Sequence, residues 1–254
     1  MVIAIIQARF SSLRLSGKVL KEIQGKTLLE HMIERVLRAK KLDKIVVATT
    51  EKPEDEAIVK IAEKLGVGTF RGSEDDVLDR FYQAAKEFGA AHIVRLTGDC
   101  PLMDPEVVDE VVNFYIQNQD KYDYASNCHL VTYPNGMETE VFSYEALERT
   151  HKEAKLLSER EHVTPYIYKH PEIFRAGNVE RSSDMSHIRI TVDNPEDFTV
   201  ISGVFNELYA ENKNFSLDDI LRLYREKPEI FSANQNIKRN EGYKKSLTED
   251  LKQR

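Results

Sequence analysis

The chain begins with an apolar run at residues 2–6 that breaks at once into a polar loop carrying three cations. Four of the five residues in the run are Val or Ile, which is typical of a strand buried on both faces of a sheet. Arg9, Arg14 and Lys18 follow, spaced so that a loop curling beyond the strand end can turn all three toward one anion. The stretch therefore predicts a buried strand with a phosphate-binding loop; a solvated basic loop is the alternative.

Behind this strand, apolar runs alternate with segments of helical periodicity. Thr27 and Glu30 form a capping box for the first helix. Such alternation predicts an α/β fold: a mostly parallel, doubly wound sheet with right-handed crossovers and helices on both faces, in three α/β/α layers. Ligands of such sheets bind beyond the carboxyl ends of the strands. The predicted strands are 2–6, 44–49, 67–70, 92–96 and 188–192, and the predicted helices are 28–37, 54–65, 73–88, 105–116 and 216–225.

The middle of the chain departs from this alternation. Residues 122–127 form a predicted strand, 134–136 a turn, and 140–142 a strand that pairs antiparallel before a helix from Ser143. Ser158 and Glu161 form a second predicted capping box. We expect one domain over residues 1–232, with an insertion at 127–179 that closes over a substrate and carries dimer contacts. A polar tail, 233–254, is expected as a surface helix or a partly disordered segment.

Charge and composition exclude several function classes. The 254 residues carry 36 Lys and Arg against 43 Asp and Glu, a net charge of −7, so bulk electrostatics attract neither nucleic acid nor an anionic membrane. The first 26 residues nevertheless form a basic island, which suits a small polyanion. Cys100 and Cys128 are too few for a disulfide framework. We see no signal peptide and no run of membrane-spanning length, and expect a soluble cytoplasmic protein.

Two carboxylates follow predicted strands without an obvious structural duty. Asp99 comes after the strand 92–96, and the neighbouring Asp104 is explained as the N-cap of a helix that starts at Pro105. Asp193 follows the strand 188–192, and Asn194 can cap the next helix in its place. Carboxylates that meet at one sheet edge suit a divalent metal, so we expect Asp99 and Asp193 to hold such an ion.

With these pieces placed, the chain resembles the sugar-acid cytidylyltransferases, the family of enzymes that make CMP-3-deoxy-manno-octulosonate and CMP-sialic acids. The residues 8–9 and 13–18 resemble the signature loop of that family, and 97–102 and 192–197 resemble its two metal-binding segments. The stretches 7–9, 71–81 and 160–166 are similar to the branch called spore coat polysaccharide biosynthesis protein F. Two departures are Ser16, where proline is usual, and 136–140, where an aspartate-centred version is expected.

The resemblance implies a fold of the nucleotide-diphospho-sugar transferase type, a homodimer, and a reaction in which CTP and an acceptor give a CMP-linked product and pyrophosphate. The acceptor is expected to be an acidic sugar of a surface polysaccharide pathway, with a phosphorylated or amino-acid-like small molecule as the alternative. The resemblance also implies that the metal ion is Mg²⁺. By resemblance, catalysis falls to Arg14, Lys18 and Asp99, nucleotide binding to Ala8, Arg9, Arg14, Lys18, Arg71, Asp79, Arg80 and Thr97, metal binding to Asp99 and Asp193, and acceptor binding to Glu138, Glu140 and His162.

Several of these positions also have structural explanations. Asp79 and Arg80 suit a charged helix face nearly as well as a nucleotide site, and His162 suits the interior or a dimer contact. Two other functions compete with the cytidylyltransferase: a glycosyltransferase of related fold using a nucleotide-sugar donor, and a non-catalytic nucleotide-binding protein of the same pathway. Glycosyltransferases usually show paired metal-binding carboxylates, whereas Asp99 stands alone in its segment.

Overall fold

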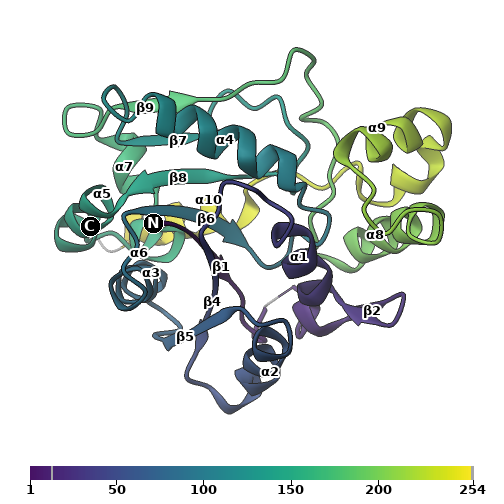
Figure 1. Ribbon diagram of the computed structural model, residues 1–254, viewed down its shortest axis with the longest axis horizontal. Coiled ribbons are helices and arrows are strands. Elements are labelled where there is room, and N and C mark those ends of the chain that lie inside the picture. The colour runs from purple at the N-terminus through teal and green to yellow at the C-terminus, as the bar shows by residue number, and fades with distance from the viewer. Residues whose placement is uncertain (13, 253–254) are drawn as a thin grey trace.

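The computed structural model, which describes residues 1–12 and 14–252, is built around a seven-stranded sheet of order β5-β4-β1-β6-β8-β7-β9 (Figure 1). Only β8 runs against its neighbours, so the predicted mostly parallel sheet and the antiparallel strand near residue 140 are both confirmed. Leu13, in the cation-loop motif, lies outside the described residues, as do 253 and 254. The strands are β1 (Val2–Gln7), β4 (Lys44–Thr50), β5 (Gly68–Gly72), β6 (His92–Thr97), β7 (Tyr124–Ser126), β8 (Glu140–Ser143) and β9 (Ala176–Asn178), and a separate hairpin pairs β2 (Glu22–Ile23) with β3 (Lys26–Thr27).

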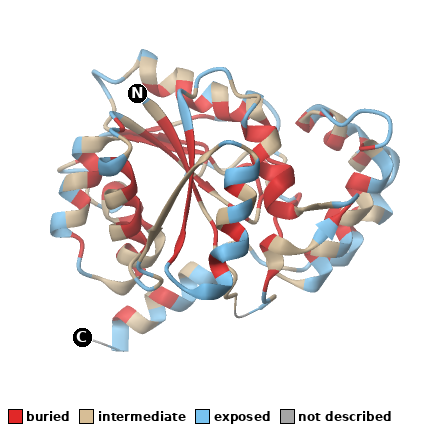
Figure 2. Cartoon of the chain, turned by 60° about the horizontal axis from the view of Figure 1, so that its bottom comes forward, coloured by how far each residue is buried: buried red, intermediate tan, exposed pale blue. Residues whose placement is uncertain are grey.

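The first strand is the centre of the sheet because both of its faces are apolar. Successive side chains of a strand point to opposite faces. Ile3 and Ile5 join one hydrophobic cluster, Ala4 and Ile6 join the other, and none of the four is exposed. Figure 2 shows the strands as buried throughout their centres, with exposed residues on the outer sides of the helices. The predicted strand buried on both faces is thereby confirmed.

Helices cover both faces of the sheet, as the alternation predicts. The cluster on one face includes residues of α1, α2, α4, α8 and α9, and the cluster on the other includes residues of α3, α5 and α7. The capping box of α1 is present, with Glu30 N donating to Thr27 Oγ1 (3.1 Å) and Thr27 N donating to Glu30 Oε2 (2.6 Å). The helices are α1 (Leu28–Val36), α2 (Glu56–Lys64), α3 (Val77–Glu87), α4 (Pro105–Gln117), α5 (Tyr144–Glu153), α6 (Leu157–His162), α7 (Pro165–Lys169), α8 (Pro195–Leu208), α9 (Leu217–Glu226) and α10 (Glu241–Lys252), with 3₁₀ turns at Lys18–Leu20, Pro53–Asp55 and Pro228–Asn234.

Three local predictions are wrong. The helix predicted from residue 73 begins at Val77, because Asp76 caps it by accepting from Asp79 N (2.9 Å). The second capping box is absent: Ser158 lies inside α6, and Glu159 instead accepts from the backbone N–H of Leu156 (3.2 Å). At α3 both Ser73 and Asp76 were possible caps, and their spacing does not distinguish them. At α6 the N-cap position is Leu156, which has no side-chain hydrogen bond to the helix, so a search for polar caps misplaces this helix start.

The third error concerns residues 188–192, which are buried and extended but form no ladder with the sheet. Their one bridge joins Arg189 to Asn135. Ile190 N donates to Asn135 O (2.7 Å), and Val192 N donates to Asp99 O (2.8 Å). The segment therefore runs along the loops beyond the strand ends, and its apolar pattern reflects burial rather than strand pairing.

The segment expected as an insertion contributes to the central sheet. Within 127–179, β8 pairs with β6 and β7, and β9 pairs with β7. The described part of the polar tail forms α10, which packs on α6 (Figure 1). Ser158 N donates to Asp250 Oδ1 (3.1 Å), and Ser246 Oγ donates to Glu161 Oε2 (2.5 Å). Polar contacts, rather than an apolar stripe, hold this last helix in place.

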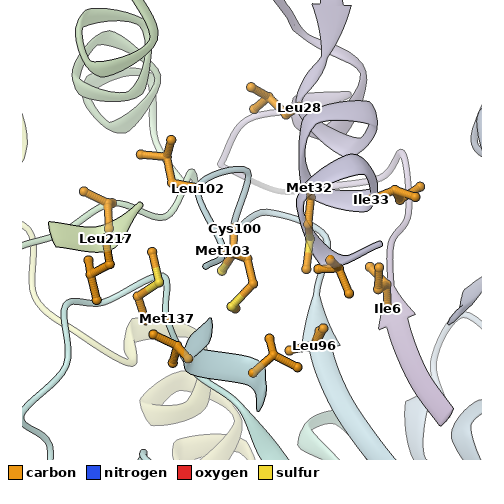
Figure 3. Close-up of a cluster of buried hydrophobic side chains, with 14 of the residues drawn as sticks. Ile6, Leu28, Met32, Ile33, Leu96, Cys100, Leu102, Met103, Met137 and Leu217 are labelled. Carbon is orange, nitrogen blue, oxygen red and sulfur yellow. The ribbon is translucent and has the colours of Figure 1, made fainter. Parts of the chain in front are cut away.

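An apolar cluster supports the segment that follows β6 (Figure 3). Cys100, Leu102 and Met103 are each at most 2% exposed. They lie in the same hydrophobic cluster as Met32 of α1 and Leu96 of β6. Asp104 caps α4 through Glu106 N (2.8 Å), as predicted. The backbone on both sides of Asp99 is thus anchored in the core, which leaves that carboxylate at the edge of the sheet.

Candidate active site

The loops after β1 and β6 start side by side at the edge of the sheet. Gln7 and Thr97 are register partners, and Gly98 N donates to Gln7 O (2.8 Å). A Cβ atom at Gly98 would lie 2.9 Å from the Ala8 Cβ, closer than packed atoms tolerate, so glycine is needed for this approach. The cation loop and the Asp99 segment are therefore held together by the backbone.

Lys18, Asp99 and Asp193 converge at this edge. The Lys18 ammonium lies 2.7 Å from Asp99 Oδ2 and 2.9 Å from Asp193 Oδ1. Arg14 Nη2 reaches the same Asp193 oxygen at 2.7 Å. The two carboxylates come from segments 94 positions apart, as their numbers show, and the hydrogen bond from Val192 N to Asp99 O (2.8 Å) ties those segments together. The two aspartates that the sequence predicts at the ends of strands are thus neighbours in space.

The charges in this cluster stabilise one another. Burial disfavours the ionised carboxyl of Asp193, but Lys18, Arg14 and Arg189 outweigh it and lower the pKa of Asp193 to about 2. Burial likewise disfavours the charged amine of Lys18, yet Asp99 and Asp193 raise its pKa above the ordinary value. Near pH 7 the site therefore holds the ionised Asp193 carboxylate beside the charged ammonium of Lys18.

Two cavities of about 500 and 420 Å³ meet at this cluster. Both volumes are typical of small-molecule sites. The first extends over the cation loop to α3, and the second extends over the turn at residues 134–138 to α7. The residues that line both are Arg14, Arg95, Thr97, Asp99, His162, Asp193, Glu241 and Gly242.

Six of the residues expected to bind a nucleotide line the first cavity, and two do not. Among the six, Arg80 is only 2% exposed; its Nη1 donates to Ser73 O (2.6 Å) and its Nε has no partner in the described residues. Arg9 reaches Glu74 at 3.9 Å. The six residues are Ala8, Arg9, Arg14, Lys18, Arg80 and Thr97.

Arg71 and Asp79 lie outside the lining of both cavities, contrary to the expectation from resemblance. Arg71 donates to Thr50 O (3.0 Å) and pairs with Glu56 (2.9 Å) beside β4. Asp79 pairs with His151 (2.8 Å) on the outer side of α3. Adjacent helical residues point in different directions, so Arg80 and Asp79 cannot share one site. We do not include Arg71 and Asp79 in the candidate site.

Glu138 and Glu140 line the second cavity, as expected for the acceptor side, but both are already held by protein groups. Glu140 pairs with Arg95, whose side chain is 13% exposed, and accepts from Tyr124 Oη (2.7 Å) and Thr164 Oγ1 (2.6 Å). Burial disfavours the ionised Glu140, but chiefly Arg95 lowers its pKa below the ordinary value. Its carboxylate therefore stabilises the wall of the cavity.

Glu138 belongs to a more open network. It pairs with Arg239 and accepts from Asn135 Nδ2 (2.7 Å) and Gly136 N (2.7 Å). A Cβ atom at Gly136 would lie 2.7 Å from the carbonyl carbon of Ile190, and φ there is 113°, so glycine is needed at this crossing. Glu138 thus fixes the turn that borders the second cavity.

His162 lies where the two cavities meet. Its Nε2 is 3.1 Å from Ser246 Oγ of α10. Burial lowers the pKa of His162 to about 4, although Glu161 opposes this change. The ring is therefore neutral near pH 7, and it lines both cavities as a hydrogen-bonding group without charge.

The structure adds residues that the sequence prediction missed. Arg95 and Arg189 each interrupt an apolar run, and such a lone buried arginine was a signal available in the sequence. Arg189 pairs with Asp193 (3.0 Å) and Asp197 (2.7 Å), which orients the candidate metal ligand. Glu241 lines both cavities from α10, a helix whose polar sequence gave no such signal.

The described residues contain no group of three or more His, Cys, Asp or Glu side chains arranged for a metal ion. Magnesium in nucleotide sites needs less than this, since one or two carboxylates suffice when phosphate oxygens and water complete the shell. Asp99 and Asp193, which already converge on one ammonium, fit that requirement.

No helix within residues 1–12 and 14–252 is both long and apolar enough to cross a membrane.

Comparisons with known proteins agree with this geometry. A family described as Cytidylyltransferase matches residues 3–237. The chain is 41% identical over 239 residues to an uncharacterized protein of Methanocaldococcus jannaschii, covering 93% of this chain and 96% of that protein. It is 32% identical over 235 residues to the spore coat polysaccharide biosynthesis protein SpsF of Bacillus subtilis, with coverage of 90% and 95%.

Among solved structures, a cytidylyltransferase from Leptospira borgpetersenii superposes with a TM-score of 0.87 at 36% identity, covering 93% of this chain and 98% of that one. The resemblance drawn from the motifs is confirmed, and with it the α/β fold. The chain belongs to the cytidylyltransferase family.

Proposed function

We propose that this protein transfers CMP from CTP to a hydroxyl of an acidic sugar and releases pyrophosphate. The observation that carries the proposal is the meeting of two cavities at Lys18, Asp99 and Asp193. A transfer between two substrates needs both to be held with the reacting atoms in contact. Adjoining cavities with shared catalytic groups between them meet that need.

The first cavity suits the nucleotide. Arg9, Arg14 and Lys18 line it from the loop after β1, where guanidinium and ammonium groups can donate to phosphate oxygens. The buried Arg80 lies at the other wall. Its Nε–H has no partner in residues 1–12 and 14–252, and we propose that it donates to a carbonyl oxygen of the cytosine. We therefore propose that the triphosphate lies toward Asp99 and Asp193 and the base toward α3.

Asp99 and Asp193 would hold Mg²⁺ when the nucleotide is bound. The ion would neutralise phosphate charge and lower the pKa of the acceptor hydroxyl. Lys18, which occupies the space between the two carboxylates, would then donate to the phosphates instead. Arg189 pairs with Asp193 throughout and keeps that carboxylate oriented.

The chemistry is an in-line displacement at the α-phosphorus. The acceptor oxygen forms a bond to phosphorus, the bond from phosphorus to the bridging β-phosphate oxygen breaks, and the hydroxyl proton is released. Negative charge grows on the departing pyrophosphate, and Arg14 and Lys18 line the cavity where they can stabilise it. The residues of this chain thus supply binding, orientation and charge stabilisation.

The second cavity supports an anionic acceptor. Its carboxylates at Glu138 and Glu140 are paired with Arg239 and Arg95. Lys238 also lines this cavity, and it forms no ion pair with a carboxylate of the described residues. A cation without a partner at the wall favours a ligand that carries a carboxylate.

The test is pyrophosphate release by the purified chain with Mg²⁺, each of the four nucleoside triphosphates, and panels of sugar acids and neutral sugars. We expect release with CTP and a sugar acid only, and a raised KM for the sugar acid in Lys238→Gln with an unchanged KM for CTP. Release of free nucleotide from a nucleotide-sugar donor, or turnover with neutral sugars alone, would overturn the proposal.

A further inference from the structure

A third cavity, of about 320 Å³, lies between α1 and the end of α8, and it shares no lining residue with the two cavities of the candidate active site. Its lining includes four cations, Lys26, Arg35, Arg38 and Lys213, and one carboxylate, Glu34. The charged side chains that line the cavity therefore carry a net charge of +3, whereas the whole chain carries a net charge of −7. Such a local excess points to a negatively charged ligand.

The single carboxylate is already neutralised. Lys26 Nζ lies 2.6 Å from Glu34 Oε1 and 2.7 Å from Oε2. Arg35, Arg38 and Lys213 form no ion pair with any carboxylate of residues 1–12 and 14–252. Lys213 instead lies over the ring of Tyr209, 5.8 Å from its centroid. Three cations of the cavity are thus without an anionic partner in the described chain.

Arg35 is the buried member of this group, with only 4% of its surface exposed. Its Nε donates to Met103 O (2.9 Å) and its Nη2 to Phe215 O (2.9 Å), which fixes the guanidinium plane. Its Nη1 is buried and has no partner among the described residues. A buried donor on a charged group that lacks a hydrogen-bond acceptor costs free energy. The described residues provide no acceptor for this atom, so a bound ligand that provides one would be stabilising.

Arg38, in the turn that follows α1, shows the same pattern. Its Nη1 donates to Asn214 O (3.1 Å), whereas its Nη2 is buried without a partner in the described residues. Burial, reinforced by the charge of Arg38, lowers the pKa of Arg35 to about 10, although Asp104 opposes this change. The Arg35 guanidinium therefore stays charged near pH 7. Arg35 and Arg38 line the same cavity, and cations that line one cavity are stabilised when an anion binds there.

We infer that this third cavity is a binding site for a small phosphate-bearing anion. A tetrahedral phosphate offers several oxygens and matches the planar forks of two guanidinium groups better than a monovalent halide does. A volume of 320 Å³ is at the small end of ligand cavities, enough for inorganic phosphate, pyrophosphate or a short phosphomonoester. The inference does not depend on the proposed function of the other two cavities.

Calorimetric titration of the full chain with inorganic phosphate, pyrophosphate and glycerol 3-phosphate tests the site and identifies the source of the phosphate group. Arg35 is left intact because it also holds two core carbonyls. The test variant is Arg38→Gln with Lys213→Gln. Its matched control is Arg149→Gln, an arginine 50% exposed on α5. Arg14→Gln, in the first cavity, reports phosphate bound at the candidate active site.

We expect the test variant to weaken phosphate binding about tenfold or more, because it removes charge-assisted hydrogen bonds. Arg149→Gln should leave the affinity for phosphate unchanged. Arg14→Gln should still bind phosphate at the third cavity. Equal affinity in the wild type and the test variant, loss of all phosphate binding in Arg14→Gln, or no binding of any of the three probes would each overturn the inference. Should the double variant lose its cooperative melting transition, Lys213→Gln alone, at an exposed position, decides the question by the same comparison.

Discussion

Arg14 donates to the carboxylate of Glu241 across 3.3 Å, a contact that joins the cation loop to the first residue of α10 over 227 positions of sequence. Both residues line the two cavities of the candidate active site. If Arg14 binds the triphosphate as proposed, Glu241 holds the guanidinium that the nucleotide would need. We therefore expect the C-terminal helix to compete with CTP for Arg14.

We expect Glu241→Gln to tighten CTP binding about two- to fivefold, because a partly exposed ion pair of this kind is worth roughly 0.2–1 kcal/mol. The measurement is the Kd for CTP by calorimetry. Glu249→Gln is the matched control, since Glu249 lines the first cavity from the same helix. If Glu249→Gln tightens binding equally, general charge repulsion explains the effect and the specific competition is refuted.

Asp99→Asn and Asp193→Asn should each lower turnover about a hundredfold or more, the usual result of removing one preorganised electrostatic group. In buffer without divalent metal, both variants should bind CTP more tightly than the wild type, because Lys18 and Arg14 lose a competing carboxylate. Pyrophosphate release measures the turnover, and calorimetry measures the affinity for CTP in the buffer without divalent metal. Normal turnover in both variants would contradict the metal assignment.

Asp104→Asn is the matched control for these two variants. Asp104 lies in the same segment as Asp99, but its oxygens accept from Glu106 N (2.8 Å) and from Leu217 N. We expect a lower melting temperature, with a loss of about 1 kcal/mol or more from the capped helix. Turnover per folded molecule should stay near the wild-type value, which separates a structural aspartate from a catalytic one.

The sheet and the cluster of Lys18, Asp99 and Asp193 could be predicted from sequence because strand ends follow simple rules. A continuous apolar run such as residues 2–6 indicates a strand that is buried on both faces. The carboxyl ends of parallel strands meet at one edge of the sheet, so the residues that follow them are expected to be neighbours. Asp193 was placed correctly although its segment is no strand, because the same apolar alternation marks a buried extended loop.

The contribution of α10 could not be predicted in the same way. Glu241 and Ser246 approach the site through polar contacts with Arg14 and Glu161, and such contacts leave no periodicity in the sequence. Arg71 shows a different relation between motif and site: this motif position pairs with Glu56 and lies outside the lining of both cavities. Local spacing specifies elements, whereas contacts between distant segments decide which side chains face the site.

Glu140 separates a structural role from an acceptor role. Its carboxylate is 5% exposed and pairs with Arg95, so Glu140→Gln leaves a buried guanidinium uncompensated. We expect a loss of about 3–5 kcal/mol in the free energy of unfolding, measured by urea denaturation. Glu153→Gln, which breaks the exposed pair with Arg149, should cost under about 1 kcal/mol. A fully stable Glu140→Gln with a raised KM for the acceptor would instead assign it to substrate binding.

His162 gives the fold a definite pH dependence. Its pKa is lowered to about 4 in the folded chain, mainly by burial, against an ordinary value of 6.5. Between these values the unfolded chain binds a proton that the folded chain does not, so stability falls as pH falls through this window. From pH 7 to 5 the wild type should lose about 2 kcal/mol more than His162→Gln in urea denaturation. Exposed His187, changed to Gln, is the control; identical slopes in wild type and His162→Gln would show that His162 is not buried neutral.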